Sequence, residues 1–368
     1  MKKSVYKRWI LLFVLCLFVP LGAVAFTNWL VDPLWSFKYS VSFAPWHELF
    51  NDRQQKTNYL LFTRPAVRTL VLGSSRKMYA DPSAWGDNGF NYAVSGLAPL
   101  EYSVLMSNIR ELELPVEKIV LGLDFFAANG LKEKQSDEGI VTTKSSLEIA
   151  RKIGYRFFSL LDWKTFLYSI KAIRRGASAS EEEYKNMMKY DHLGLDTQLF
   201  FVVSGDAAER KNLISGTIAS YHKTYQEFHY NESFSTRLSS FLQIAGDAEV
   251  IPLLTPVGTP FLRLIAQTPG RLDDYERWIR ESVSIFGGVW GFMDVNVVTR
   301  DPSLWMEPSH HSPEVSSWMA DRIHGRGEPP ECFGVYIDKE NVETYIAQVR
   351  EDIEKLLIEK DAWDLLME

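Results

Sequence analysis

The chain has 368 residues, of which 46% are hydrophobic and 24% are charged, so it is long and apolar enough to form a substantial globular core. Its formal net charge is −7, and residues 1–8 contain four basic residues, which makes the remainder more acidic still. Phosphate binding requires a positive surface, so this charge argues against a nucleic-acid partner. Cys16 and Cys332 lie too far apart in the sequence to pair plausibly, and we expect no disulfide.

Residues 1–33 form a segment of their own. The four basic residues are followed by residues 9–26, which carry no charge. This pattern indicates an export signal or a membrane anchor. Ala23-Val24-Ala25 resembles a signal-peptidase site, but the apolar run is long for a signal peptide, and we favour a retained single-pass anchor in the inner membrane. A basic flank stays in the cytoplasm, which places the rest of the chain in the periplasm or outside the cell.

Alternating strands and helices predict an α/β domain with a doubly wound parallel sheet over residues 34–330. Short apolar runs predict strands at 68–73, 89–96, 116–126, 248–255 and 292–298. Helical spacing of apolar residues predicts helices at 100–114, 271–285, 316–323 and, beyond the core in residues 331–368, at 341–366.

The third and fourth predicted strands are separated by far more chain than one crossover needs, since a whole βαβ unit takes about 30 residues. Residues 130–245 therefore predict a helical insertion over the edge of the sheet, with helices at 145–161, 163–175 and 223–244. An insertion after the carboxyl end of a strand can form a lid or a partner surface.

The first predicted strand ends in Gly73-Ser74-Ser75, at the sheet edge where open α/β sheets bind ligands. A serine at that position is rigidly held and can serve as a nucleophile if a base lies nearby. The simpler interpretation is a strand-to-helix turn in which serine caps the helix.

A candidate base follows the last predicted strand, in the loop that contains Glu307 and His310. A carboxylate three residues before a histidine can bind its Nδ1 and leave Nε2 free to accept a proton from Ser75. Both loops lie at carboxyl ends of strands, so we expect them to meet. Glu307, His310 and His311 could instead bind a metal ion, although no other cluster has metal-ligand spacing, and we expect neither a metal nor an organic cofactor.

With both segments in view, residues 68–325, apart from the insertion, resemble the SGNH (GDSL-like) hydrolase superfamily, and most of all its membrane-anchored members in envelope polysaccharide O-acylation systems. In that resemblance Ser75 takes the nucleophile position, Ser74 replaces an aspartate, and Glu307 with His310 matches an Asp-x-x-His block. Gly96 matches an oxyanion-hole glycine, and the backbone N–H groups of Ser75 and Gly96 would form the hole. We expect a flavodoxin-like sheet with strand order 2-1-3-4-5.

Asp124 departs from the family pattern, because it stands where the superfamily has an asparagine that donates to the oxyanion. An ionised carboxylate cannot donate a hydrogen bond. Asp124 therefore has another role, or the hole relies on backbone N–H groups alone, or the site is weak.

The expected function is that of an exported serine esterase or O-acyltransferase with a Ser-His-Glu triad. The resemblance implies an envelope glycan or lipid that carries an ester-linked acyl group, with acetyl the expected group, as substrate, and a multispanning acyl-donor membrane protein as a partner. Two alternatives stay open: a non-catalytic scaffold or glycan-binding component with the same fold, and a metal-dependent hydrolase.

Overall fold

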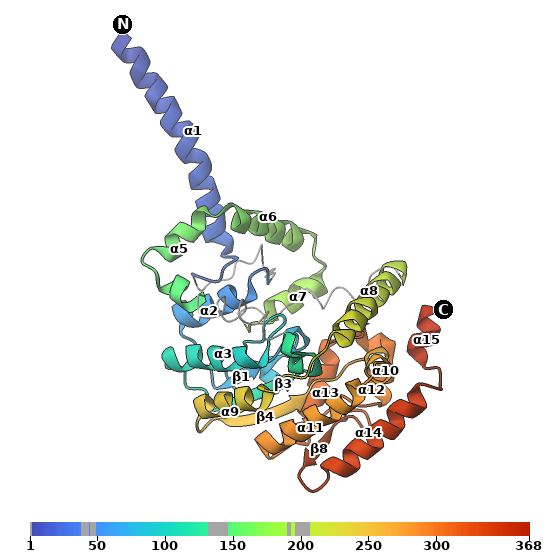
Figure 1. Ribbon diagram of the computed structural model, residues 1–368. Coiled ribbons are helices and arrows are strands. Elements are labelled where there is room, and N and C mark those ends of the chain that lie inside the picture. Colours follow the sequence, from blue (N-terminus) through green and yellow to red (C-terminus); the bar gives the residue numbers. More distant parts are fainter. Residues whose placement is uncertain (1, 38–43, 45–48, 132–145, 190–192, 196–206) are drawn as a thin grey trace. The chain divides into compact units, whose positions relative to one another are not determined.

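The computed structural model describes residues 2–37, 44, 49–131, 146–189, 193–195 and 207–368 (Figure 1). The chain divides into two compact units. The first comprises Met1–Arg64 with Ser145–Asp191, and the second comprises Pro65–Lys144 with His192–Glu368. The first unit is therefore built from two separate stretches of sequence, and the helices at 146–189 belong to it rather than to the unit that contains the sheet.

The first unit is helical in its described part. Its helices are α1 (Lys2–Val31), α2 (Asp52–Thr63), α5 (Tyr155–Phe158), α6 (Trp163–Ser178) and α7 (Glu181–Lys189), with the 3₁₀ turn η4 (Ser159–Leu161) between α5 and α6. Val5–Val31 of α1 is long and apolar enough to cross a membrane once. The helix predicted at 145–161 is broken, because Gly154 adopts a left-handed conformation before α5.

Helix α2 is polar yet largely buried, because its carboxamides bind backbone groups that no regular structure satisfies. Gln55 Nε2 donates to Pro33 O at 2.9 Å, and Asn58 Nδ2 donates to Leu34 O at 2.8 Å. Gln54 Nε2 donates to Ser146 O at 3.0 Å. These bonds fix the chain just after α1 and join the two sequence stretches of the unit.

The second unit is a mixed α/β fold with a mostly parallel six-stranded sheet. The strands are β1 (Thr69–Leu72), β2 (Gly89–Asn91), β3 (Lys118–Leu123), β4 (Glu249–Leu254), β5 (Gly288–Gly291) and β8 (Val335–Asp338). They lie side by side in the order β2-β1-β3-β4-β5-β8. The first five are parallel, and β8 pairs antiparallel with β5.

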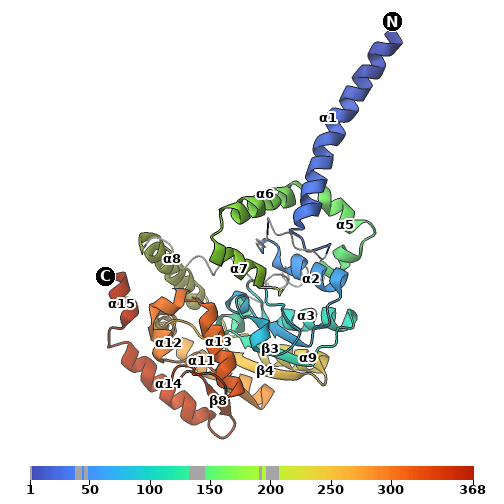
Figure 2. The same cartoon turned by 180° about the vertical axis from the view of Figure 1, so that it is seen from behind.

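Helices cover both faces of this sheet (Figures 1 and 2). One face carries α3 (Pro99–Glu111), α9 (Phe234–Ala245) and α11 (Arg271–Phe286), which pack against one another in series. On the other face, Val71, Val120 and Ile251 pack against α13 (Pro313–His324). Parallel strands buried on both faces read as continuous apolar runs, which is why β1 and β3 were recognisable in the sequence. The remaining helices of this unit are α8 (Ala207–Gln226), α10 (Thr259–Gln267), α12 (Val297–Arg300), α14 (Val342–Leu356) and α15 (Ala362–Met367).

The strand predicted at 292–298 is wrong, because β5 lies before it. α11 ends at Gly287 in a left-handed conformation, and β5 follows at once. The β-branched run then begins helix α12 instead, because the Asn296 side chain accepts from the backbone N–H groups of Val298 and Thr299. Capping outweighs β-propensity here.

Two further predictions are corrected at the C-terminal end. The helix predicted at 341–366 is two helices, α14 and α15, because Asp361 caps a new start by accepting from the backbone N–H groups of Trp363 and Asp364. The sheet also continues past the predicted end of the core, since β8 adds an antiparallel edge strand. The helix predicted at 223–244 is likewise divided, with α8 ending at Gln226 and α9 starting at Phe234.

Gly122 on β3 lies against a buried side chain and supplies a test of this packing. A Cβ at Gly122 would lie 2.6 Å from Lys77 Cγ and 3.2 Å from Thr255 Oγ1. Gly122→Ala should therefore lower the free energy of unfolding by about 1–3 kcal/mol through overpacking. The measurement is thermal or denaturant unfolding of the full chain in detergent.

The matched control is Gly216→Ala in α8, where a Cβ would meet nothing within 4 Å. Removing a glycine from a helix should leave stability unchanged or raise it by up to about 1 kcal/mol. Equal stability of the Gly122→Ala variant and the parent protein would contradict the packing described.

Candidate active site

The turn after β1 presents Ser75 at the carboxyl edge of the sheet. Gly73 has a φ of +157°, and a Cβ there would lie 2.7 Å from Lys77 Cγ, so the turn requires glycine. Ser74 is buried, and its Oγ accepts from the backbone N–H of Arg76 at 3.3 Å. The Ser74 cap and the 3₁₀ turn η1 (Ser75–Lys77) that it begins hold the Ser75 side chain in a partly exposed position. Ser74 thus has the capping role that the simpler interpretation assigned to this turn, while Ser75 is left available.

The loop that carries the candidate base is a short hairpin of β6 (Trp305–Glu307) and β7 (His310–His311). Its register places Glu307 directly opposite His310. His310 Nδ1 forms a short contact with Glu307 Oε1, and His310 Nε2 lies 2.9 Å from Ser75 Oγ. A carboxylate only accepts, so Nδ1 carries the ring proton and Nε2 accepts from the Ser75 hydroxyl. The structure brings together the three residues that the sequence singled out, across 235 positions of chain.

Glu307 is buried and is held as a carboxylate by its neighbours. Ser309 donates to it twice, from its Oγ at 2.6 Å and from its backbone N–H at 2.8 Å. Burial alone would raise the pKa of Glu307, but the bonds from His310 and Ser309 outweigh it and hold the pKa below its usual value. The sequence reasoning missed Ser309, although it lies inside the Glu-x-x-His loop and could have been noticed there.

Asp124 has a structural partner in Arg76, the residue after the nucleophile. Arg76 Nη1 donates to Asp124 Oδ1 at 3.1 Å, and both side chains are almost fully buried. Arg76 also contacts Tyr221 Oη at 3.3 Å and lies over the ring of Phe126, 4.9 Å from its centroid. Of the roles left open for Asp124, the structure therefore supports another role, in which it neutralises a buried guanidinium beneath Ser75.

Lys77 completes this buried charge group. It has no solvent exposure, and its Nζ lies 3.4 Å from Met319 Sδ. Burial lowers the pKa of Lys77 to about 7, although the charge of Asp124 opposes that shift. Its chain passes between Gly73 and Gly122, which is why both positions exclude a Cβ. Arg76 and Lys77 were missed in the sequence, because two basic residues after a strand read as a solvated turn.

His311, the second histidine of the loop, belongs to the core rather than to the reacting pair. Its Nδ1 lies 2.9 Å from Ser312 O, and its ring packs edge-on against Trp305. Burial, together with the charge of Lys77, lowers the pKa of His311 to about 3, so the ring is neutral. Within the described residues, no group of three or more His, Cys, Asp or Glu side chains is arranged to hold a metal ion.

Gly96, the predicted oxyanion-hole glycine, lies near the same sheet edge. Val94, two residues earlier, donates its backbone N–H to Gly73 O at 3.0 Å. Gly96 is exposed, adopts a φ of +64°, and would give a Cβ nothing to contact within 4 Å. Its left-handed backbone favours glycine, and its role as an oxyanion donor stays a prediction.

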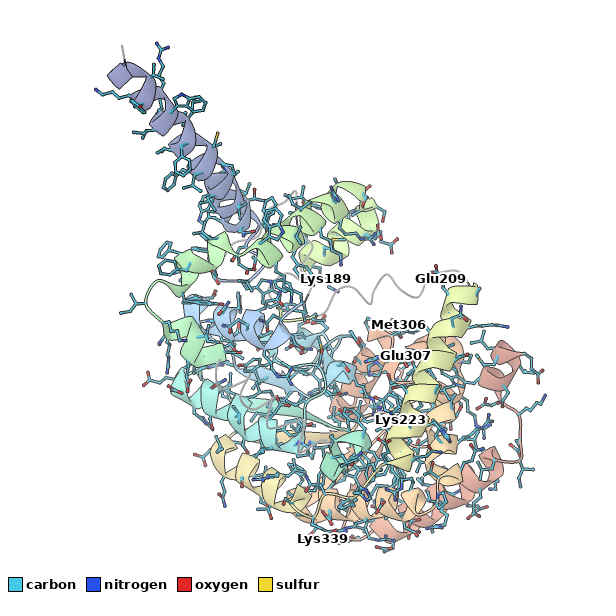
Figure 3. The ribbon with its side chains drawn as sticks, turned by 45° about the horizontal axis from the view of Figure 1, so that its top comes forward. Lys189, Glu209, Lys223, Met306, Glu307 and Lys339 are labelled. Carbon is cyan, nitrogen blue, oxygen red and sulfur yellow. The ribbon has the colours of Figure 1, made fainter. Side chains whose placement is uncertain are left out.

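A cavity of about 650 Å³ opens beside the candidate triad, between α8 and the β6–β7 hairpin. Figure 3 shows Met306 and Glu307 next to α8. Helix α8 contributes residues at helical spacing, among them Leu213, Gly216 and Thr217, and the hairpin contributes Ser309 and His310. Arg210 fixes α8 to the hairpin by donating from Nη2 to Trp305 O at 3.0 Å. The cavity is lined mainly by apolar atoms and extends to the His310 side chain.

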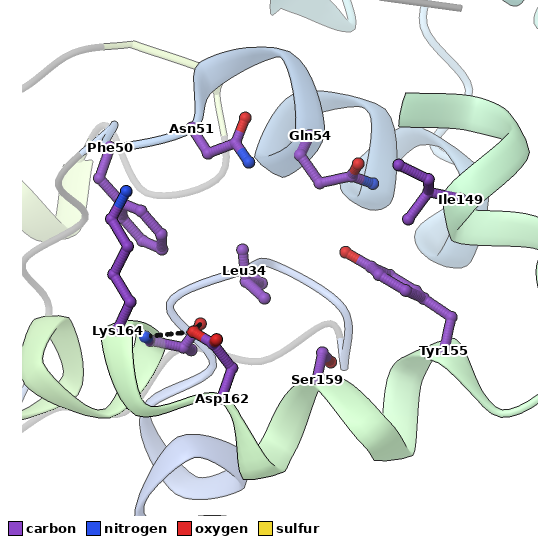
Figure 4. A pocket seen from close by; sticks show the side chains of 10 residues that line it. Leu34, Phe50, Asn51, Gln54, Ile149, Tyr155, Ser159, Asp162 and Lys164 are labelled. Carbon is purple, nitrogen blue, oxygen red and sulfur yellow. Dashed lines mark hydrogen bonds between the residues drawn. The ribbon is translucent and has the colours of Figure 1, made fainter. Parts of the chain in front are cut away.

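The first unit contains a separate cavity of about 400 Å³ (Figure 4). Gln54 lines it from α2 and Asn51 from the residue before that helix, Leu34 lies between, and Tyr155 and Asp162 line it from the α5–α6 side. Asp162 is the cap of α6 and accepts from Thr165 N at 2.6 Å. No histidine or cysteine is among its described lining residues, and we assign no chemistry to it.

Comparison with protein-family models, with curated proteins and with solved structures finds no match to this chain. The functional assignment therefore rests on the geometry of the site.

The buried ammonium of Lys77 predicts a pH-dependent stability. The unfolded chain keeps this proton up to a pKa of 10.5, whereas the folded chain releases it at about 7. Between these values the unfolded state binds more protons, so stability rises with pH. Lys77→Met keeps the volume and removes the charge. Its melting temperature should exceed that of the parent most at or below pH 7, with the difference shrinking as pH approaches 10.5.

Thermal unfolding of the detergent-solubilised chain across this pH range measures the effect. Exposed Lys339→Met serves as the control and should shift the melting temperature equally at every pH. A difference for Lys77→Met that does not change with pH would contradict the assignment of a desolvated ammonium.

Proposed function

We propose that the protein is a serine esterase or O-acyltransferase that acts on ester-linked acyl groups, with Ser75 as nucleophile, His310 as base and Glu307 as the group that orients His310. The observation that carries the proposal is the continuous chain from Glu307 to His310 Nδ1 and from His310 Nε2 to Ser75 Oγ at 2.9 Å. A hydroxyl with a base in reach, and a base with a carboxylate in reach, is the arrangement that activates serine.

In the first half-reaction Ser75 Oγ attacks the ester carbonyl while its proton passes to His310 Nε2. The tetrahedral intermediate then collapses, the alkoxy C–O bond breaks, and His310 returns the proton to the departing alcohol. In the second half, water or a sugar hydroxyl loses its proton to His310 and attacks the acyl-enzyme. The second tetrahedral intermediate collapses, the bond between Ser75 Oγ and the acyl carbon breaks, and His310 returns the proton to Ser75 Oγ. Glu307 stays ionised throughout and stabilises the imidazolium, which its lowered pKa supports.

The oxyanion would be stabilised by the backbone N–H groups of Ser75 and Gly96. Arg76 lies directly after the nucleophile and is paired with Asp124, and Lys77, whose pKa is lowered to about 7, is only partly protonated at neutral pH. Positive charge beneath the turn favours the developing oxyanion in a low-dielectric site.

The same residues support membership of the SGNH superfamily as a proposal. The strand order β2-β1-β3-β4-β5 in the parallel part of the sheet is consistent with the flavodoxin-like order that the resemblance implies. With α1 as a retained anchor and its basic end in the cytoplasm, the catalytic unit would face the periplasm or the outside. The substrate would then be an envelope glycan or lipid, and the acyl donor would come from a multispanning membrane protein, by analogy alone.

The decisive measurement is covalent labelling of the full chain with a fluorophosphonate, which reports an activated serine. Ser75→Ala should abolish labelling, and His310→Ala and Glu307→Gln should slow it by about 10²–10⁴-fold, because the base is lost or held in the wrong tautomer. Ser83→Ala, at an exposed serine after the same strand, should label at the parent rate. A folded parent protein that does not label would favour a non-catalytic scaffold.

The cavity beside His310 predicts where the part of the substrate beyond the reacting ester binds. Gly216→Leu would fill this space, since nothing lies within 4 Å of a Cβ there. We expect kcat/KM for p-nitrophenyl hexanoate to fall about tenfold, equivalent to about 1.4 kcal/mol of binding lost in the transition state, with the rate of labelling by a small fluorophosphonate unchanged.

Gly216→Ala is the matched control and should retain activity on the longer ester. If Gly216→Leu has the same kcat/KM as the parent for both the acetate and the hexanoate ester, the cavity does not bind the substrate. That result would leave the assignment of the triad unaffected.

A further inference from the structure

The first unit carries a concentration of exposed apolar side chains between α5 and α6. Exposed large apolar residues on a folded protein mark an interaction surface when they gather in one region. Six residues within fifteen positions are each between 48% and 100% exposed, and they define the apolar collar: Ile153, Phe157, Phe158, Leu161, Trp163 and Leu167.

The apolar collar is attached to the end of α1. Asn28 Nδ2 donates to Leu160 O at 2.8 Å and to Asp162 O at 3.1 Å, and Ser169 Oγ donates to Asn28 Oδ1 at 2.8 Å. Asn28 is buried, whereas residues 5–23 of α1 are exposed. Both η4 and α6 pack against α1. The collar therefore lies beside the point at which α1 enters its unit, and Figure 1 shows α5 and α6 on either side of that end of α1.

The length of α1 fixes the depth of that point in a bilayer. The last charge of the N-terminal flank is Arg8, and a hydrocarbon core about 30 Å thick takes about 20 helical residues at 1.5 Å each. Counting from Trp9, the twentieth residue is Asn28. Asn28, which binds the backbone between α5 and α6, thus lies where the hydrocarbon ends. Phe26 and Trp29, with ring centroids 5.9 Å apart, provide aromatic side chains at the same level.

The charge of this segment is opposite to that of the chain. Residues 151–175 contain seven basic residues and one acidic residue, whereas the whole chain carries −7. Helix α6 is amphipathic, with exposed Trp163 and Leu167 at helical spacing and Lys164, Lys171 and Arg174 on its surface. Basic residues interleaved with exposed Trp, Phe and Leu are the pattern of a helix that lies in the headgroup region of anionic lipids.

We infer that the apolar collar inserts into the boundary between headgroups and acyl chains of the same bilayer leaflet at which α1 emerges. The occupant of this surface is the lipid itself, because the α1 length, the Asn28 bonds and the basic charge all place the collar at the membrane surface. The unit is then held to the membrane at two levels, a spanning helix and an interfacial ring. The inference rests on the part of the proposed function in which α1 is a retained anchor, and not on the catalytic triad.

Spin-label accessibility in vesicles that contain anionic lipid tests the inference with the full chain. Phe158→Cys and Trp163→Cys, each in a Cys16→Ser, Cys332→Ser background, carry the label at exposed collar positions. Ile358→Cys, at an 88% exposed apolar residue of the other unit, is the matched control. Labels at 158 and 163 should lose collisions with a water-soluble nickel chelate and gain collisions with oxygen, relative to the label at 358.

Native Cys16, labelled in a Cys332→Ser protein, serves as the internal reference for α1. If the label at 16 is in the bilayer while those at 158 and 163 collide with nickel as often as the label at 358, the inferred insertion of the collar is wrong. The interpretation of α1 as a retained anchor is then still supported. If the label at 16 is itself accessible to nickel or is cleaved off, the anchor and the collar are both wrong. Neither result bears on fluorophosphonate labelling of Ser75, so failure of the catalytic proposal is recognised separately.

Discussion

The buried ion pair between Arg76 and Asp124 is the constraint on which the site depends. Arg76 follows Ser75 directly, so its position fixes the turn that presents Ser75, and it cannot remain charged in the core without a partner. Asp124 supplies that partner from the carboxyl end of the adjacent strand β3. Removing one member of such a pair typically costs 3–5 kcal/mol, roughly the size of a small domain's stability. The chemistry at Ser75 is therefore linked to the integrity of two neighbouring strands.

The same guanidinium connects the nucleophile to the cavity. Arg76 contacts Tyr221 of α8, whose ring lies 4.2 Å from that of Phe261 in α10, and Arg210 fixes α8 to the β6–β7 hairpin. One helix thus contacts the turn that carries the nucleophile and the hairpin that carries the base. A shift of α8 would alter the Ser75–His310 distance as well as the width of the cavity, so under the proposed function substrate fit and the geometry of proton transfer are coupled.

The sequence was sufficient for the parts of the site that depend on topology. Ser75 and His310 could be predicted to meet despite their distance in the sequence, because parallel strands end at one edge of a sheet. A hairpin with two intervening residues then brings Glu307 opposite His310. The partner of Asp124 could not be found in this way, because an ion pair 48 positions apart depends on side-chain packing.

Strand β5 was misplaced since Asn296 caps a helix inside a β-branched run, and β8 was missed because edge strands carry a weaker apolar signal. The division of the chain into two units built from separate stretches likewise depends on tertiary contacts, such as that between Gln54 and Ser146.

The passage of Lys77 between Gly73 and Gly122 has an evolutionary consequence. The three positions share one volume, so the effect of a substitution at any of them depends on the residues at the other two. A methyl group gained at Gly122 clashes with the lysine chain but would be accommodated beside a shorter residue at position 77. Mutational paths through this region are therefore ordered, with the lysine shortened before Gly122 is replaced, whereas the backbone of Gly73 requires glycine in either case. Relatives that lack the lysine would be free to carry alanine or serine on β3, and those that keep it would retain both glycines.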